Sequence, residues 1–266
     1  MNIRPPAVAG MFYPADPEHL RTTVAALLAD ASTPAAPPPK ALIAPHAGYV
    51  YSGAVAAAAF ATLHAARGIE RVVVIGPAHY VRVAGIAVPT AEAFETPLGR
   101  VPVDRQVLAA IADLPSVGRS DAAHAPEHAL EVELPFLQAV LGPFTVVPLL
   151  VGDGVAAHLA EVLRRVWGGA ETLVVVSSDL SHYYDDATAR RRDAATAAAI
   201  ERGDGARLGP DDACGYLPIA GLLVEAQERG LKPRRLALRN SGDAAGARAR
   251  VVGYGAWSFA AAPPMP

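Results

Sequence analysis

The sequence predicts a single α/β domain spanning residues 1–266, with helices covering both faces of a central, mostly parallel or mixed sheet. Two observations lead to this fold class. Apolar runs of strand length alternate along the chain with longer stretches of helical character, which is the pattern of a largely parallel sheet. Each run is apolar throughout rather than alternating with polar residues, as is typical of strands that are buried on both faces.

The predicted elements follow in order. A helix begins after Asp16, its N-cap, with Pro17 at the first helical position, and ends near Asp30. Residues 31–39 are rich in proline and are expected to form a surface loop within the domain. Strands are expected at Ala41–Ala44, Val72–Ile75, Thr145–Val151 and Leu173–Val176, and helices at Ser52–Ala66, Asp104–Asp113, Glu127–Leu141, Val155–Trp167, Asp186–Gly203 and Gly215–Gly230. Two final strands, Arg235–Arg239 and Arg250–Phe259, are expected to pair antiparallel.

Composition and charge argue against several classes of protein. The chain has 266 residues, a formal charge of −3 and no long basic run, so nothing in it indicates nucleic-acid binding. Its single cysteine, Cys214, permits no intrachain disulfide, and a reducing compartment is expected. We find neither a signal-peptide core at the N-terminus nor a run approaching the ~18 apolar residues of a membrane span. We therefore expect a soluble cytoplasmic protein without membrane or nucleic-acid partners.

Histidines recur where predicted strands end. His46 follows the first strand, His79 follows the second through a Gly-Pro-Ala turn, and Asp179 and His182 follow the fourth. Because ligands bind at the carboxyl ends of parallel strands, these side chains are expected to meet across one cleft. This arrangement requires one edge of the sheet to carry Pro45, Gly76 and Ser177.

Two further groups of residues leave alternatives open. Cys214 precedes an apolar helix whose dipole would favour the thiolate, although most free cysteines are small buried hydrophobic residues. His128 and Glu131 lie three residues apart on an expected helix, so that one metal could contact both. Acidic residues also suit the first turn of a helix. We favour a structural or ligand-supporting role for Glu127, His128 and Glu131.

Seven segments of the chain resemble, in order, the Memo family, whose prokaryotic members are called AmmeMemoRadiSam system protein B. The segments are APHAGYVYSG, IGPAHY, FETPLGRVPVD, EHALEVELPFLQ, VVVSSDLSHY, CGYLPIAGLL and VVGYGA. The match spans nearly the whole chain, from AVAGMFYP near the N-terminus to the last strand. The resemblance implies the fold of the class III extradiol dioxygenases.

The same resemblance implies that His46, His79, Asp179, His182 and Cys214 line one cleft. Related dioxygenases hold Fe(II) with two histidines and a carboxylate. Among the candidates for a third, anionic ligand, which are Cys214, Asp179 and Glu131, we favour Cys214, and so predict a metal site of His46, His79 and Cys214. Fe(II) is the expected metal, although Zn or Cu also suits a thiolate. His182 is expected to act as an acid/base group, oriented by Asp179.

The function indicated is a metal-dependent redox or dioxygenase-like enzyme with non-haem iron, acting on an unknown small molecule or protein. One alternative is a non-catalytic protein that binds a peptide or partner in the same cleft. Another is a hydrolase with a zinc-bound water. The family name also implies AMMECR1-like and radical SAM proteins as partners.

Overall fold

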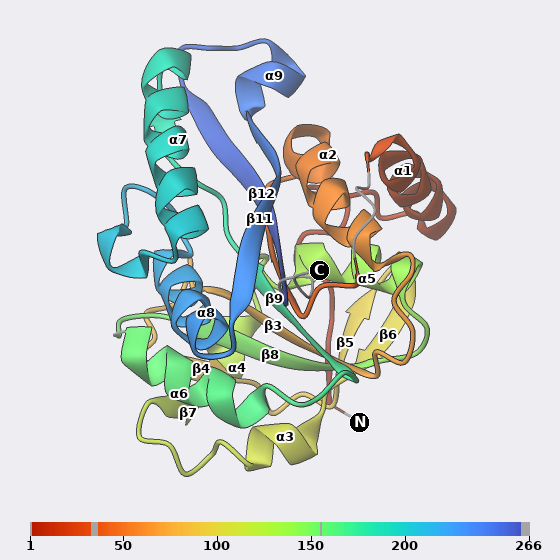
Figure 1. The fold of residues 1–266 in the computed structure, drawn as a ribbon. Helices are drawn as coiled ribbons and strands as arrows, with labels where there is room; N and C mark the ends of the chain where they lie inside the picture. Colours follow the sequence, from red (N-terminus) through yellow and green to blue (C-terminus); the bar gives the residue numbers. More distant parts are fainter. Residues whose placement is uncertain (1, 33–36, 155, 262–266) are drawn as a thin grey trace.

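The central sheet of the computed structural model is mixed, and its strands have the order β10-β12-β2-β9-β3-β8-β4-β7, with β11 paired to β12 (Figure 1). The structure describes residues 2–32, 37–154 and 156–261. The strands of this sheet are β2 (Ala41–Ala44), β3 (Arg71–Pro77), β4 (Ile86–Val88), β7 (Val117–Arg119), β8 (Thr145–Val151), β9 (Thr172–Ser177), β10 (His182–Tyr184), β11 (Leu231–Asn240) and β12 (Val251–Ala261). A smaller sheet contains β1 (Ile3–Arg4), β5 (Ala93–Thr96) and β6 (Gly99–Pro102).

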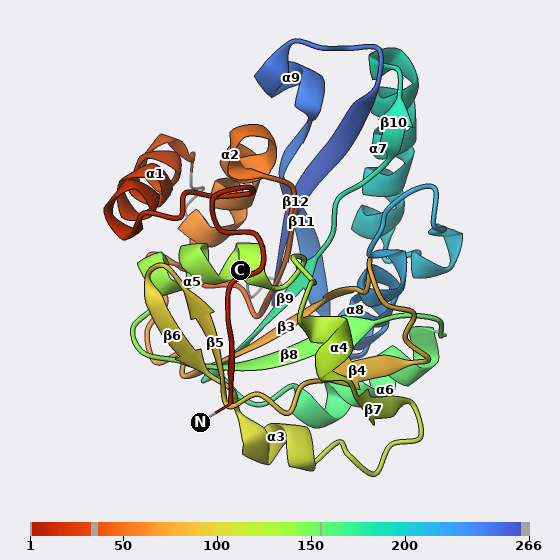
Figure 2. The ribbon, with the colours of Figure 1, turned by 180° about the vertical axis from the view of Figure 1, so that it is seen from behind.

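Helices cover both faces of the central sheet, as the sequence predicts for this fold class. The α-helices are α1 (Pro17–Asp30), α2 (Tyr49–Phe60), α3 (Arg105–Ala109), α4 (Asp121–His124), α5 (Leu134–Val140), α6 (Ala156–Val166), α7 (Asp186–Arg202), α8 (Tyr216–Glu228) and α9 (Ser241–Ala245). Short 3₁₀ helices are η1 (Ala61–Leu63), η2 (Glu131–Glu133) and η3 (Gly205–Arg207). Both views place α1, α2 and α5 on one side and α6, α7 and α8 on the other (Figures 1 and 2). The buried apolar side chains form one continuous cluster.

The four strands at the centre of the sheet are parallel, and their carboxyl ends form one edge. Strand β9 pairs in parallel with both β2 and β3, and β3 pairs in parallel with β8. Ala44 lies opposite Ser177, and Ile75 lies opposite Val176. The prediction that Pro45, Gly76 and Ser177 share one edge is therefore confirmed, and so is the antiparallel pairing of the last two strands.

Several predicted boundaries are wrong. The expected helix Glu127–Leu141 is replaced by a loop, then η2 and α5. The reason is that the Glu127 carboxylate accepts the backbone N–H groups of His128 and Ala129, both at 2.9 Å, and so holds them in a turn. The expected helices Ser52–Ala66 and Asp104–Asp113 end early, at Phe60 followed by η1 and at Ala109.

Some of the expected features lie partly outside the described residues. This applies to residues 33–36 of the Pro-rich loop, while residues 31–32 and 37–39 form neither helix nor strand. It applies also to Val155, the expected start of the helix that the structure describes from Ala156. None of the helices in the described ranges combines the length and apolar composition that crossing a membrane requires.

Candidate metal centre

Three imidazoles come together at the carboxyl edge of the sheet. They belong to His46 after β2, His79 after β3 and His128 in the loop before η2, and one ring nitrogen from each lies within 4.8 Å of the other two. Ring centroids are 4.7 Å apart for His79 and His128, 5.1 Å for His46 and His79, and 5.3 Å for His46 and His128. Neutral imidazole is the commonest metal ligand among side chains, so this group is suited to hold a metal ion.

Gly76 lets the loop that carries His128 approach the end of β3. A Cβ atom at this position would lie 3.1 Å from Leu130 Cδ2 and 3.2 Å from Ala129 Cβ, which is tighter than most such contacts. Because glycine has no Cβ, residues 129 and 130 pack directly against the strand. This close packing sets His128 beside His79.

A buried carboxylate orients His79. Glu127 accepts the backbone N–H of His79 at 2.6 Å, and its Oε1 lies 2.9 Å from His79 Nδ1. Burial favours the protonated acid, but hydrogen bonds from His128 and His79 outweigh it and hold the pKa of Glu127 well below its ordinary value. The ionised carboxylate accepts the Nδ1 proton, which leaves His79 Nε2 free to bind a metal, as in many metalloproteins.

Replacing Glu127 with Gln is expected to lower metal affinity about 10- to 100-fold, because His79 loses the carboxylate that fixes its tautomer. Isothermal titration with Zn²⁺ measures the effect, with circular dichroism to verify the fold. An affinity equal to that of the wild type would show that Glu127 does not support a ligand.

Ser177 links His46 to a second buried carboxyl group. Its Oγ lies 2.8 Å from His46 Nδ1, 2.6 Å from the Ala129 carbonyl oxygen and 2.8 Å from Glu133 Oε1. The carbonyl can only accept, so it takes the single hydroxyl proton, and His46 Nδ1 must donate to Ser177. His46 Nε2 is therefore the unprotonated atom. Burial, followed by the neighbouring His79 and His128, lowers the pKa of His46 well below its ordinary value, so the ring is neutral.

Glu133 completes this network as a neutral acid. The side chain is fully buried, and burial raises its pKa well above the ordinary value. A protonated Oε1 can donate to Ser177, whose own proton is engaged elsewhere. Within the described residues, Oε2 has no hydrogen-bond partner, which disfavours a charge there further.

This protonation state makes stability depend on pH. A folded-state pKa above the unfolded value stabilises the protein below about pH 4.3, and the contribution falls as pH rises toward the folded pKa. We expect Glu133→Gln, which is neutral at every pH, to gain stability relative to the wild type as pH rises above the ordinary pKa of a glutamate, with a slope of at most about 1.4 kcal/mol per pH unit. Urea denaturation at several pH values measures this difference. A difference that does not change with pH would contradict a neutral Glu133.

His128 is held by two groups on its Nδ1 side. This atom lies 3.2 Å from Glu127 Oε1 and 3.3 Å from the hydroxyl of Tyr80. Its ring packs on Phe12, with centroids 4.7 Å apart. His128 was not predicted to join the histidine cluster because the sequence pattern placed it on a helix. Its position within the matched segment EHALEVELPFLQ was the available signal.

Cys214 lies beside the histidine cluster. Its Sγ is 3.4 Å from His46 Nε2 and 3.6 Å from the Asp179 carbonyl oxygen. The expectation that the helix N-terminus favours its thiolate is not met, because burial and the nearby Asp179 carboxylate raise the thiol pKa to about 12. The group of mutually close ligand atoms contains His128 and not Cys214. The ligand set with Cys214 stays a prediction from the sequence and is an alternative to the three histidines.

Asp179 and His182 also lie in this region. Asp179 is buried, its Oδ1 accepts the backbone N–H of His46 at 2.9 Å, and burial raises its pKa. His182 Nδ1 lies 2.8 Å from the Leu180 carbonyl oxygen, a contact within its own loop. The hydrogen bond that orients the His182 ring is therefore to Leu180, whereas Asp179 holds the backbone of a metal-ligand candidate. The catalytic roles of both residues stay predictions.

An open cavity of about 660 Å³ adjoins the three histidines, within the size range of small-molecule sites. It is lined by Met11, Phe12, His46, Ala47, Gly48, Tyr51, His79, Tyr80, His128, Asp179, His182, Tyr183, Ser241, Ala247, Arg250, Val252 and Tyr254. The fold and the site together define a class: a mixed α/β protein with a histidine cluster suited to a metal at the carboxyl edge of its sheet.

Comparison with known proteins shows that the chain belongs to the Memo family. Residues 4–258 match the family model described as Memo-like protein. MEMO1 family proteins of Aeropyrum pernix and Aquifex aeolicus are each 35% identical to this chain, with 96% of this chain and 98% of the relative covered. That of Sulfolobus acidocaldarius is 36% identical, with coverage of 95% and 97%. The predicted family is thus confirmed.

A solved structure supports the fold alone. The uncharacterized protein JW3007 from Escherichia coli K12 superposes with a TM-score of 0.52 at 13% sequence identity. The match covers 80% of this chain and 98% of that chain. At this identity the likeness says nothing about activity.

Proposed function

We propose that this protein is a metal-dependent oxidoreductase that holds Fe(II) on His46, His79 and His128. The observation that carries the proposal is the convergence of three imidazoles, each of which has a polar partner at its Nδ1 atom. Three ligands leave coordination positions open for a small molecule, and a cavity adjoins the site. Bound Fe(II) would supply one-electron and oxygen chemistry there.

The remaining residues of the cleft support this reaction. His182 is half-buried and lines the cavity, where its Nε2 is the atom placed to exchange a proton with a substrate. Phe12 and Tyr254 contribute aromatic side chains to the wall of this cavity. We propose iron because the family resemblance implies the fold of the class III extradiol dioxygenases, and related dioxygenases hold Fe(II). The substrate can be a small molecule or a group on a protein.

A zinc-dependent hydrolase is the second candidate function. The observation that favours it is the ligand set itself, because three histidines and an open position also form catalytic zinc sites. In that reaction the cavity would hold the molecule to be hydrolysed, and His182 would again exchange a proton.

Metal analysis of protein purified under nitrogen separates these functions, combined with oxygen uptake by the iron-loaded protein in the presence of catechol. The proposal predicts about one iron per chain and catechol-dependent oxygen uptake. His19→Ala, at an exposed position in α1, is the control that should change neither. Stoichiometric zinc without oxygen uptake would instead support the hydrolase.

A further inference from the structure

Exposed apolar side chains gather at the mouth of the cavity. In the described part of the chain, Met11, Tyr51, Tyr80 and Tyr183 are four of six large hydrophobic residues that are exposed, and all four line this cavity. Exposed apolar surface is unfavourable in water, and its concentration around one opening marks a binding site. A ligand with a flat apolar body would cover these rings.

Tyr183 has an unusual backbone conformation for a non-glycine residue. Its φ is +64°, the only positive value of a non-glycine residue within the described ranges. It lies between His182 and Tyr184, where the pairing of β10 with β12 is irregular. The conformation is unfavourable for a tyrosine, yet the side chain is 63% exposed and contributes little to the core. Strain of this kind, kept without a gain in packing, is typical of functional positions.

The strained backbone places the Tyr183 ring beneath Arg250. The guanidinium carbon of Arg250 lies 5.0 Å from the ring centroid, a cation–π contact that orients the side chain. Both residues line the cavity. Within the described residues, Arg250 forms no ion pair with a carboxylate, so its hydrogen-bond donors remain open to a ligand.

The balance of charge in the cavity favours an anion. Arg250 is the one lysine or arginine among its lining residues, and Asp179 is the one carboxylate. Asp179 is buried and its Oδ1 is occupied by the backbone of His46, so it does not neutralise the rim. A divalent metal on the histidines would make the cavity more positive still.

We propose that Arg250 and Tyr183 form a subsite that binds the carboxylate or phosphate group of a substrate whose flat apolar body lies against Tyr51 and Tyr80. The proposal rests on the proposed function, since it names the class of substrate for that site. A guanidinium pairs with either anion through two parallel hydrogen bonds, and the cation–π contact holds it in place for this pairing.

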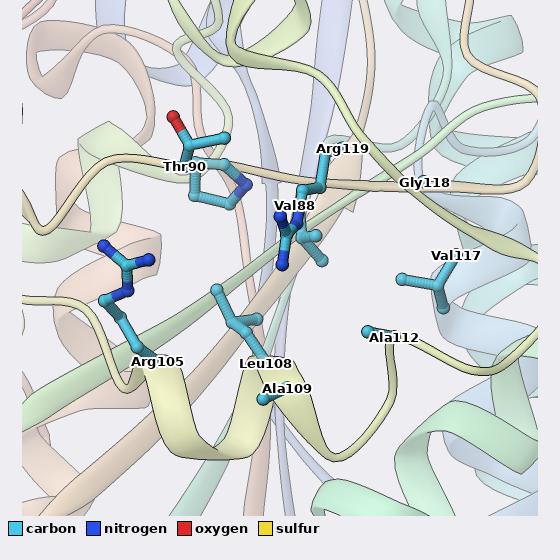
Figure 3. A pocket seen from close by; sticks show the side chains of 10 residues that line it. Val88, Thr90, Arg105, Leu108, Ala109, Ala112, Val117, Gly118 and Arg119 are labelled. Atoms are coloured by element: carbon cyan, nitrogen blue, oxygen red, sulfur yellow. The ribbon is translucent and has the colours of Figure 1, made fainter.

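A second cavity of this protein provides the matched control. It has a volume of about 430 Å³ and lies between α3 and strands β4 and β7, away from the histidines. Figure 3 shows Arg105 and Arg119 among its lining side chains, together with the apolar Val88 and Leu108. An exposed arginine beside apolar surface is thus present at both places, but only the first adjoins the histidine cluster and carries a strained tyrosine.

The experiment is calorimetric titration of the purified protein with benzoate, phenyl phosphate and the uncharged benzamide. We expect one or both anions to bind at least about tenfold more tightly than benzamide. Arg250→Gln should remove this preference, and Arg119→Gln should retain it. The preference should persist after the metal is removed by dialysis against a chelator. The tighter of the two anions then identifies the group that the subsite accepts.

Three outcomes would overturn the proposal. One is equal affinity of the wild type for the anions and benzamide, and another is an unchanged preference in Arg250→Gln. The third is a preference of the wild type that disappears when the metal is removed, because the anion would then bind the metal itself. Since the comparison of Arg250→Gln with Arg119→Gln needs no metal, failure of the metal site and failure of the subsite are distinguishable.

Discussion

Removing the imidazole of His128 is expected to lower the affinity for Fe(II) or Zn²⁺ by about 100-fold or more. The change removes a ligand, so its effect should exceed the 10- to 100-fold loss typical of residues that only support ligands. The physical reason is that His46 and His79 alone would provide two neutral nitrogens, while the third nitrogen within 4.8 Å of both belongs to His128. Calorimetric titration of His128→Ala with Zn²⁺ measures the loss.

Cys214→Ser is the informative companion to this variant. Its Sγ lies near His46 Nε2 but outside the group of three mutually close ligand atoms, so we expect a smaller effect than that of His128→Ala. Wild-type metal affinity in His128→Ala, together with a large loss in Cys214→Ser, would restore the ligand set of His46, His79 and Cys214.

Replacing Glu131 with Ala is expected to destabilise the protein by about 3–5 kcal/mol, the cost typical of breaking a buried ion pair by removing one partner. The Glu131 carboxylate is fully buried and ion-paired with Arg4. It also accepts the backbone N–H groups of Ala7 at 2.7 Å and Val8 at 3.0 Å, and the hydroxyl of Tyr13. Its loss leaves the Arg4 guanidinium buried without a counter-charge. Urea denaturation measures the free energy of unfolding.

The same substitution should affect the cleft, because the segment tied down by Glu131 continues to Met11 and Phe12 in the cavity wall. Glu18→Ala is the control, since Glu18 and Arg21 form an exposed ion pair whose loss should cost less than about 1 kcal/mol. If Glu131→Ala lost no more stability than Glu18→Ala, the Glu131 network would not hold the N-terminal segment in place.

The fold class and the edge that carries the histidines could be predicted because both depend on local patterns. The runs Ala41–Ala44 and Thr145–Val151 coincide with β2 and β8, since continuous apolar residues are typical of strands in the middle of a parallel sheet. Strands β1, β4, β5, β6, β7 and β10 were not predicted. They contain two to four residues, too few for a periodic pattern to develop.

The candidate site could be predicted only in part. His46 and His79 follow buried strands, so the topology alone brings them together. His128 comes from a loop whose course depends on Glu127 capping backbone N–H groups and on the missing Cβ of Gly76. The Glu127 caps are local, but Gly76 lies about 50 positions from Ala129 and Leu130 in the chain, so no local pattern reveals that contact. The burial and the nearby Asp179 that raise the pKa of the Cys214 thiol likewise do not follow from its position before a helix.

X-ray absorption spectroscopy of the metal-loaded protein tests the central claim most directly, because it distinguishes nitrogen from sulfur in the coordination shell. For the zinc-loaded protein, the account predicts about three imidazole nitrogens at about 2.0–2.1 Å and no sulfur. A sulfur ligand at about 2.3 Å would contradict it and would place Cys214 on the metal.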